Sequence, residues 1–402
     1  MTALAERALA MADAIADQLT DPGAVPAGTA RLRGQSLAGG AAGIALLHIE
    51  RARAGRGDWA VANAWLRAAA AEPISAGPNA TLFFGAPALA FLTHTAVEQT
   101  GRLNRALAAL DKATISVTRR RLDAAHARRA AGRRPPLAEF DLIRGLAGLG
   151  SYHLRRGHPI LIDILTYLVR LTEPQSDGLP GWWTDLDPSG SPSPSYPDGH
   201  GNAGMSHGIA APLALLATAH RHGFEVAGQH EAIDRICSWL DSHQRPGPGG
   251  PRWQGIVTQP PSGRAPAPLL GRPRPSWCYG TPGIARAYQL AALATGDATR
   301  QHTAESALLA CLQTPDELDQ ISEPGLCHGL AGLVVTTFRA ASDATTHDLA
   351  ATLPALVERL LAQLPTPDGD PELFDGLAGA ALALHTAATA PAAGWDATLL
   401  LL

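Results

Sequence analysis

The chain has 402 residues, of which 46% are hydrophobic, 17% charged and 5% aromatic, and its formal net charge is −4 at pH 7. This length provides for one large domain or for two to three ordinary ones, and the apolar content is ample for a core. The small negative net charge excludes a general affinity for nucleic acid or for an anionic membrane surface. Four cysteines in so long a chain do not make a disulfide framework.

The amino-terminal segment, MTALAERALAMADAIADQL, predicts an amphipathic helix. Charged residues between positions 6 and 17 interrupt the apolar run that a signal peptide would need. The longest uncharged stretch, residues 376–395, contains His385 and Pro391 and therefore predicts a buried helix followed by a loop, not a membrane span. We expect a soluble, cytoplasmic protein, in which thiols stay reduced and can hold a metal ion.

One pattern recurs seven times: a turn, then Gly-x-x-Gly or a near variant, then a stretch rich in Ala and Leu, which favour helix. The first glycines of the seven copies are Gly40, Gly85, Gly145, Gly208, Gly280, Gly329 and Gly376. The shortest spacing, 45 residues, suits two helices and two turns. Small residues one turn apart would let neighbouring helices approach closely. The pattern predicts an all-α fold in which seven inner and seven outer helices close into a ring, since the last copy lacks the polar face of a solenoid cap.

Longer spacings between the copies indicate insertions near residues 119–139, 173–204 and 245–276 of one domain that spans residues 1–402. The second and third are rich in Pro, Gly and Ser and lead directly into glycine-marked helices, so we expect long loops that shape the mouth of a pocket. Within the first insertion, residues 119–134 carry seven arginines and a single acid, Asp123. It could bind an acidic peptide, but the solvated end of an outer helix is the favoured interpretation.

Two short segments place two thiols and an imidazole at the openings of two helices: Trp277-Cys278-Tyr279-Gly280 and Cys327-His328-Gly329. Cys278 and Cys327 are 49 residues apart, which is one repeat, so we expect them on adjacent inner helices at equivalent heights. Two thiolates and one imidazole are three ligands of a tetrahedral zinc site, and the open fourth position is typical of a catalytic zinc. The alternative, in which Cys278 and His328 are ordinary core residues, is disfavoured because three donors share the pattern. Cys237 and Cys311 lie in outer-helix patterns and are predicted to be core thiols.

Three further residues are expected at the same end of the ring. His207 holds the corresponding place in the fourth copy, Asp141 lies just ahead of the third, and Arg274 precedes Cys278 by four residues. They could supply a proton carrier, an orienting carboxylate and a cation. Capping roles for His207 and Asp141 and a plain loop role for Arg274 remain open. For Asp375, which precedes the last copy, we prefer a capping role.

These motifs resemble the lanthionine synthetase C family, the cyclases of lanthipeptide biosynthesis. The segments that carry the resemblance over essentially the whole chain are Trp277-Cys278-Tyr279-Gly280-x-Pro282-Gly283, Cys327-His328-Gly329, Asn202-x-Gly204-Met205-x-His207-Gly208 and Pro180-Gly181-Trp182-Trp183. The resemblance implies a toroid of seven inner and seven outer helices and a Zn²⁺ ion held by Cys278, Cys327 and His328. It also implies a site lined by His207, Asp141, Arg274 and Tyr279, with His207 as the favoured acid/base. Ala88 and Ala211 stand where a second glycine is expected, which touches helix packing only.

The resemblance implies a Michael-type addition of peptide cysteine thiols to dehydroalanine or dehydrobutyrine, which forms (methyl)lanthionine thioether rings. A free thiol has a pKa of ~8.5 and is mostly protonated at neutral pH, whereas a thiol bound to zinc is deprotonated. Arg274 or protonated His207 would stabilise the enolate, and His207 or a water that it holds would protonate the α-carbon. Asp141 would orient His207 or that water, and Tyr279 is either a site residue or a packing residue.

Two other functions remain open. A member of the same family could add the thiol of glutathione to dehydrated residues, and a non-catalytic toroid could bind peptide around a structural zinc ion. The expected partners of a cyclase are a dehydrated precursor peptide, with leader and core, and a lanthipeptide dehydratase and exporter. No nucleic acid and no stable membrane insertion are expected.

Overall fold

In the computed structural model, residues 2–24, 34–97, 103–259, 274–364, 366 and 369–402 are described. Seven helices begin one or two residues after the first glycine of the seven copies of the pattern, and nearly all their residues are buried. They are α2 (Ala41–Arg53), α4 (Ala86–Val97), α7 (Leu146–Arg156), α9 (Ala210–Arg221), α11 (Thr281–Thr295), α14 (Leu330–Asp343) and α16 (Leu377–Thr389). These are the helices that the repeated pattern predicts as the inner set.

A second set of seven helices alternates with the first along the chain. They are α1 (Ala3–Gln18), α3 (Trp59–Ala69), α5 (Asn104–Ala130), α8 (Leu161–Leu171), α10 (Gln229–Ser242), α12 (Ala298–Leu312) and α15 (Asp348–Gln363). These helices are amphipathic: α8, for example, buries Ile164 and Leu168 and exposes Asp163. Aspartates cap two of them, because Asp58 accepts a hydrogen bond from the Ala60 N–H and Asp297 from the Arg300 N–H.

The second glycine of the pattern has a reason that the sequence analysis did not anticipate. A Cβ atom at Gly283 would lie 1.9 Å from the carbonyl oxygen of Trp277, and one at Gly332 would lie 2.0 Å from that of Leu326. In both copies the turn before the helix therefore folds back onto the first helical turn. The closest obstacle is the chain's own preceding turn, not a neighbouring helix.

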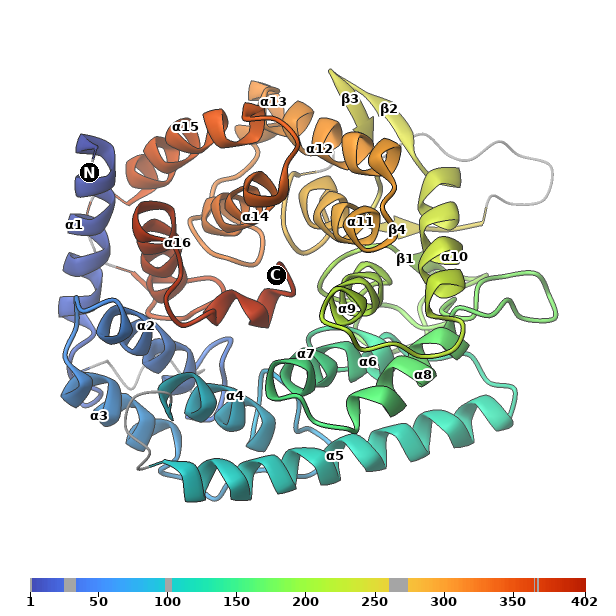
Figure 1. The fold of residues 1–402 in the computed structure, drawn as a ribbon, viewed down its shortest axis with the longest axis horizontal. Coiled ribbons are helices and arrows are strands. Elements are labelled where there is room, and N and C mark those ends of the chain that lie inside the picture. The colour runs from blue at the N-terminus through green and yellow to red at the C-terminus, as the bar shows by residue number, and fades with distance from the viewer. Residues whose placement is uncertain (1, 25–33, 98–102, 260–273, 365, 367–368) are drawn as a thin grey trace. The chain divides into compact units, whose positions relative to one another are not determined.

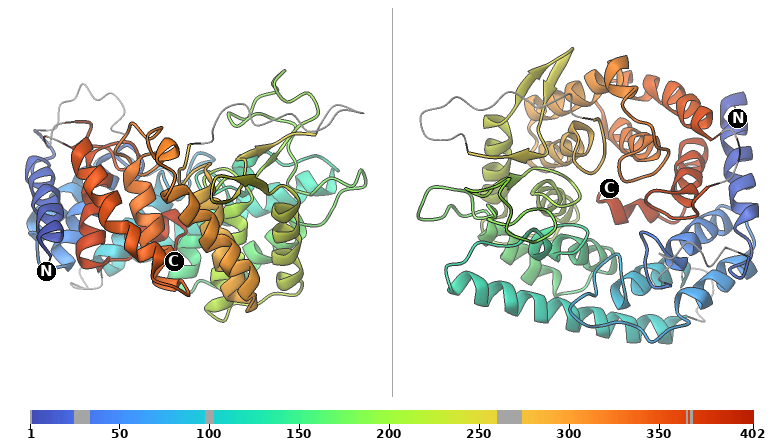
Figure 2. Two further views of the ribbon diagram at one scale, coloured as in Figure 1. Left: turned by 90° about the horizontal axis from the view of Figure 1, so that it is seen from above. Right: turned by 180° about the vertical axis from the view of Figure 1, so that it is seen from behind.

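The remaining elements are short. Two one-turn helices, α6 (Leu137–Phe140) and α13 (Pro315–Leu318), and the 3₁₀ helix η1 (Trp395–Leu399) accompany four strands, β1 (Gly201–Asn202), β2 (Arg245–Gly247), β3 (Gly250–Arg252) and β4 (Ile256–Val257). β1 pairs antiparallel with β4, with Gly201 opposite Val257, and β2 pairs antiparallel with β3, with Arg245 opposite Arg252. Figure 2 shows the hairpin of β2 and β3 in yellow. All four strands lie in the two predicted loop insertions; residues 260–273 lie outside the described residues.

The arginine-rich insertion is largely helical, because α5 continues to Ala130. Several of its arginines have acidic partners within the protein: Arg128 lies 2.6 Å from Glu139, Arg134 lies 3.1 Å from Asp185, and Arg129 pairs with Glu173. Arg121 donates to two backbone carbonyl groups. These partners favour a structural role for the stretch over the binding of an acidic peptide.

The chain divides into two compact units. The first comprises Met1–Val117, Ile321–Ser342 and His347–Thr398, and the second comprises Thr118–Gln320, Asp343–Thr346 and Leu399–Leu402. In the first unit α1 packs against α16 and α2 against α3, and in the second α11 packs against both α9 and α12 (Figure 1). Among the described residues, no helix is long and apolar enough to cross a membrane.

Candidate metal centre and acid–base pair

The turn that carries Cys278 belongs to the second unit and is almost completely buried. The Cys278 side chain lies 3.5 Å from the Ser276 hydroxyl, which also accepts a hydrogen bond from the Gly280 N–H. Trp277 is fully buried and donates its indole N–H to the carbonyl oxygen of Leu399, at 3.1 Å. The buried Trp277 side chain therefore anchors the turn, and the Ser276 hydroxyl lies next to the Cys278 thiol.

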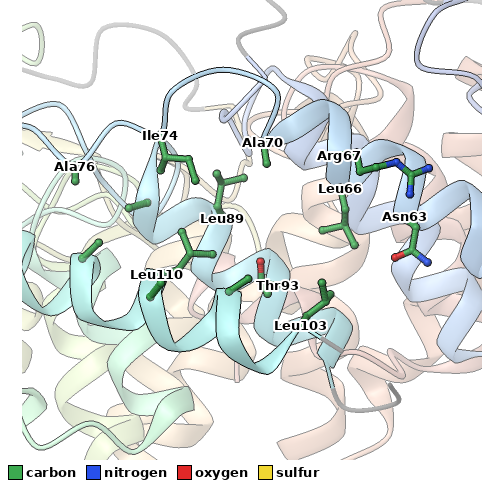
Figure 3. Close-up of a pocket in the computed structure, with 14 residues that line it drawn as sticks. Asn63, Leu66, Arg67, Ala70, Ile74, Ala76, Leu89, Thr93, Leu103 and Leu110 are labelled. Atoms are coloured by element: carbon green, nitrogen blue, oxygen red, sulfur yellow. The ribbon is translucent and has the colours of Figure 1, made fainter. Parts of the chain in front are cut away.

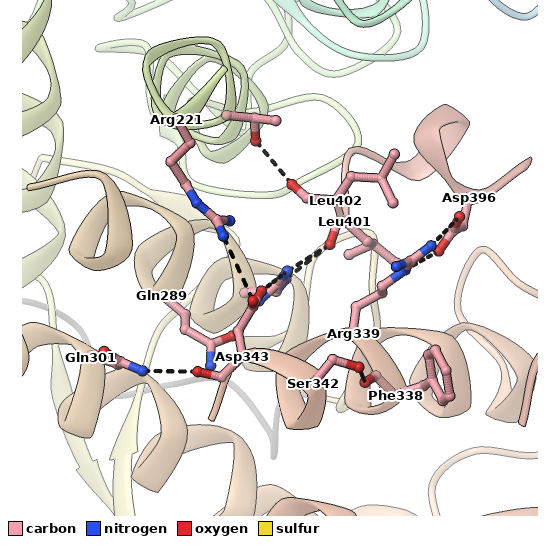
Figure 4. A network of polar contacts seen from close by, with 12 residues as sticks. Arg221, Gln289, Gln301, Phe338, Arg339, Ser342, Asp343, Asp396, Leu401 and Leu402 are labelled. Carbon is pink, nitrogen blue, oxygen red and sulfur yellow. Dashed lines mark hydrogen bonds and ion pairs between the residues drawn. The ribbon is translucent and has the colours of Figure 1, made fainter. Parts of the chain in front are cut away.

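The last residues of the sequence pack against α9 and α11 within the second unit (Figure 4). The guanidinium of Arg286, in α11, is 1% exposed and donates to the Leu401 carbonyl oxygen at 3.0 and 2.8 Å. Asp343 lies 2.7 Å from the same guanidinium, and Thr218 of α9 donates to the Leu402 carbonyl at 3.0 Å. The helix that follows Cys278 is thus anchored by polar contacts along its buried face.

The turn that carries Cys327 and His328 belongs to the first unit and is only partly buried. The Cys327 N–H donates to the Phe374 carbonyl oxygen at 3.0 Å. Two carboxylates flank the imidazole: Glu323 Oε2 lies 2.5 Å from Nε2 of His328, and Asp375 Oδ1 lies 3.9 Å from Nδ1. Gly376, not Asp375, is the N-cap of α16, and no side chain caps that helix, so the preferred capping role of Asp375 does not describe its position.

Cys278 of the second unit and Cys327 and His328 of the first unit offer two thiols and one imidazole, a donor set that could hold a metal ion. Among the described residues, no other group of at least three histidine, cysteine or acidic side chains qualifies. The other two thiols are unsuited to metal binding, since burial raises the pKa of both Cys237 and Cys311 to about 12. Their predicted role as core thiols agrees with this environment.

His207 and Asp141, both in the second unit, form a close pair. Nδ1 of His207 lies 2.6 Å from Oδ2 of Asp141, whose side chain is fully buried, while the His207 side chain is 23% exposed. The carboxylate accepts the Nδ1 hydrogen, which leaves Nε2 free to carry a proton to or from a substrate. His207 does not cap α9, whose N-cap is Ile209. Asp141 both orients His207 and accepts the backbone N–H of Arg144 at 2.6 Å.

Ser206, next to His207, joins this pair to the Cys278 turn. The Ser206 N–H donates to the Cys278 carbonyl oxygen at 3.1 Å, and the Ser206 carbonyl accepts the N–H of Leu142 at 3.2 Å. Backbone hydrogen bonds therefore connect the openings of three helices of the second unit, those that carry Asp141, His207 and Cys278.

Comparison with known proteins identifies the family in which these motifs occur. The family model described as lanthionine synthetase C-like protein matches residues 32–400. The chain belongs to this family. The resemblance read from the sequence motifs is therefore confirmed.

Two relatives show how far the similarity extends. This lanthionine synthetase C-like protein is 28% identical to the nisin biosynthesis protein NisC of Lactococcus lactis subsp. lactis over 207 residues, which are 50% of this chain and 48% of NisC. The chain thus spans about half the length of the curated relative that it matches. The solved structure of nisin cyclase superposes with a TM-score of 0.75 at 20% identity and covers 92% of this chain and 93% of that one. The all-α toroid predicted as the fold class is confirmed by this match.

Two other predicted site residues have distinct surroundings in the second unit. The ring of Tyr279 lies beside that of His207, with centroids 6.1 Å apart and planes tilted by 35°. Burial raises the pKa of Tyr279 to about 12, although a hydrogen bond with Asn202 opposes the shift. Gly204 and Gly255 leave room for the ring, because a Cβ at either would lie within 3.0 Å of it. The side chain of Arg274 is exposed.

Sequence reasoning missed two charged residues that lie beside predicted site residues: Arg144 beside Asp141 and Glu323 beside His328. The Nε atom of Arg144 lies 3.8 Å from Asp141 Oδ2, and Glu323 contacts His328 as described above. Arg144 could have been found, because it directly precedes the first glycine of its copy, as His207, Tyr279 and His328 do in theirs. No comparable signal marks Glu323.

A cavity in the first unit has a mostly apolar lining and is therefore unsuited to metal binding or proton transfer (Figure 3). It has a volume of about 550 Å³ and lies between α3, α4 and α5, where leucine and alanine side chains such as Leu66, Leu89 and Leu110 form most of its lining. Arg67 is its single charged residue. The candidate site is therefore defined by the side chains at the helix openings and not by this cavity.

Proposed function

We propose that this protein is a zinc-dependent lanthipeptide cyclase, which adds cysteine thiols of a dehydrated precursor peptide to dehydroalanine or dehydrobutyrine. In this reaction the sulfur–carbon bond forms at the β-carbon and the carbon–carbon π bond breaks. The thiol loses one proton and the α-carbon gains one, so the peptide mass does not change. The observation that carries the proposal is the donor group of Cys278, Cys327 and His328 in a chain of this family. A dehydratase and an exporter would act before and after it.

The chemistry of the donors fits zinc. Two thiolates and one neutral imidazole are typical zinc ligands, and Cys278, Cys327 and His328 would hold the ion. Glu323 lies 2.5 Å from Nε2 of His328, so it would accept the hydrogen of that nitrogen and orient the imidazole, as carboxylates commonly do beside zinc-bound histidines. When bound, the ion would supply the Lewis acidity that lowers the pKa of a substrate thiol and favours its thiolate at neutral pH.

Proton transfer falls to His207. Asp141 accepts the Nδ1 hydrogen of His207 and so fixes which ring nitrogen faces the substrate. Protonated at Nε2, His207 would deliver a proton to the α-carbon of the enolate, and its positive charge would stabilise the enolate before transfer. Tyr279, whose hydroxyl stays protonated because its pKa is raised to about 12, would line the same site.

The proposal is tested with a synthetic peptide that holds one dehydroalanine and one free cysteine. Incubation with the zinc-loaded protein should consume the thiol without a change in peptide mass, as read by thiol alkylation and mass spectrometry. A mass gain in the presence of glutathione would replace cyclisation by glutathione addition. Unaltered peptide that nevertheless binds would identify a non-catalytic peptide-binding protein.

The variant His207→Ala separates proton transfer from metal binding. We expect it to retain zinc and to turn over more slowly by about 10²-fold or more, the usual contribution of a general acid–base group. His222→Ala is the matched control, since His222 bonds to the Thr218 carbonyl at the end of α9. Wild-type turnover of His207→Ala would contradict the assigned role.

A further inference from the structure

The segment Thr184–Ser191 of the first predicted loop has a defined structure of its own. Thr184 and His200 exchange backbone hydrogen bonds of 3.0 and 2.8 Å, and Nε2 of His200 donates to the Leu186 carbonyl oxygen at 3.0 Å. Oδ1 of Asp187 accepts the N–H groups of Ser189 and Ser191 at 2.9 and 3.0 Å. Hydrogen bonds from Ser189 and Ser191 lower the pKa of Asp187, which keeps this carboxylate ionised as an acceptor. Hydrogen bonds within the loop and to His200 therefore define its conformation.

Arg144 connects this loop to the His207–Asp141 pair. Its Nη2 donates to the Pro188 carbonyl oxygen at 2.8 Å, and its Nε lies 3.8 Å from Asp141 Oδ2. Its backbone N–H donates to the other oxygen of the same carboxylate at 2.6 Å. One residue thus contacts both oxygens of Asp141 and the tip of the loop.

The main chain of Arg144 is in turn held by Arg121. The partly buried guanidinium of Arg121 donates to the Arg144 carbonyl oxygen at 2.7 Å, and desolvation lowers the pKa of Arg121 while the charge of Asp141 opposes that shift. The main chain of Arg144 therefore has fixed contacts on both sides. Its side chain is 35% exposed, so it lies at the boundary between the buried carboxylate and solvent.

We propose that Arg144 is a positioning residue that ties the loop Thr184–Ser191 to the His207–Asp141 pair, so that the loop forms a fixed wall that aligns the peptide substrate. The alignment of a peptide rests on the proposed cyclase function, whereas the tie between loop and pair does not. A guanidinium suits this geometry, because Nη2 donates to the Pro188 carbonyl while Nε lies 3.8 Å from the Asp141 carboxylate. The single ammonium of lysine serves one of the two.

The tie is tested first without any activity measurement. Hydrogen exchange of residues 184–191 is followed by mass spectrometry in the wild type, in Arg144→Lys and Arg144→Gln, and in the control Arg170→Lys, which changes an exposed arginine of α8. We expect exchange in the loop to become about tenfold faster in both Arg144 variants and to stay unchanged in the control. Unchanged exchange in Arg144→Gln would overturn the proposal. Circular dichroism and thermal unfolding of each variant separate loss of the tie from general unfolding.

The wall is tested next by kinetics with the dehydroalanine–cysteine peptide. Asp187→Ala loosens the loop without touching Asp141, so we expect KM to rise about tenfold while kcat falls less than twofold. Arg144→Lys should show the same rise in KM, and Arg144→Gln should lower kcat as well because Asp141 loses its neighbouring cation. An unchanged KM in both Asp187→Ala and Arg144→Lys would overturn the wall. If the wild type does not cyclise the peptide, the proposed function and the wall fail together, whereas the exchange result still decides whether Arg144 ties the loop.

Discussion

The turn that carries Cys278 and the turn that carries Cys327 have the same glycine pattern but different surroundings. Cys278 is 5% exposed and is held by neutral groups, with the Ser276 hydroxyl at its sulfur and the Ser206 N–H at its carbonyl. The Cys327 turn is partly exposed, and two carboxylates flank its histidine. The pattern therefore sets the backbone of both turns, whereas contacts from distant residues decide the chemistry of each. We infer that Cys278 is fixed by packing and that His328 is oriented by charge.

Removal of either thiol gives the largest expected effect. If each thiolate supplies about a third of a zinc-binding free energy of roughly 10–16 kcal/mol, Cys278→Ala and Cys327→Ala should each weaken zinc binding by about 10²- to 10⁴-fold. Elemental analysis after dialysis and peptide turnover should both approach zero. Cys237→Ala is the control, because that thiol is buried in α10. A Cys278→Ala protein that keeps stoichiometric zinc would contradict the assignment of Cys278 as a metal ligand.

Glu323→Gln tests whether charge orients His328. Since outer carboxylates typically contribute 10–100-fold to metal affinity, we expect zinc affinity to fall by about that factor, measured by competition with a chelator. Asp375→Asn should have a smaller effect, because its oxygen lies 3.9 Å from the imidazole against 2.5 Å for Glu323. Equal affinity of Glu323→Gln and the wild type would mean that packing holds both turns alike.

Alanine at the second glycine tests the shared backbone. Gly283→Ala and Gly332→Ala should each lower the free energy of unfolding by about 2–4 kcal/mol, because the new Cβ would meet a carbonyl oxygen at 1.9 or 2.0 Å. Urea unfolding measures the loss, and Gly77→Ala, where the nearest atom is 3.5 Å away, should change it little. We expect zinc affinity to fall more in Gly283→Ala, since the buried Cys278 turn has less room to relax.

Tyr279→Phe should have the smallest effect. Because burial raises the pKa of Tyr279 to about 12, its hydroxyl stays neutral through the range in which the enzyme would be assayed. Wild type and variant should therefore have parallel pH–rate profiles between about pH 7 and 10 and differ by about two- to fivefold in rate. An alkaline decline that appears in the wild type alone would show that the hydroxyl titrates during turnover.

The repeated pattern predicted the inner helices well because each begins at a local signal, a glycine whose neighbours are fixed by the preceding turn. Asp141 and His207 are 66 positions apart in sequence, and the structure brings their side chains to 2.6 Å of each other. Glu323 and the loop around Asp187 could not be assigned, because their roles depend on contacts between distant turns. The short strands of the insertions are likewise set by pairing partners more than 50 residues away, as Gly201 and Val257 show.

The hydrogen bond from the Trp277 indole to the Leu399 carbonyl makes the Cys278 turn depend on a residue 122 positions further along the chain. Arg286 and Thr218 likewise form hydrogen bonds with the carbonyl groups of Leu401 and Leu402. A contact between segments so far apart in sequence can form only after both have been synthesised. We therefore expect the Cys278 turn to reach its final geometry late in the folding of the second unit, which would postpone the binding of a metal ion to that stage.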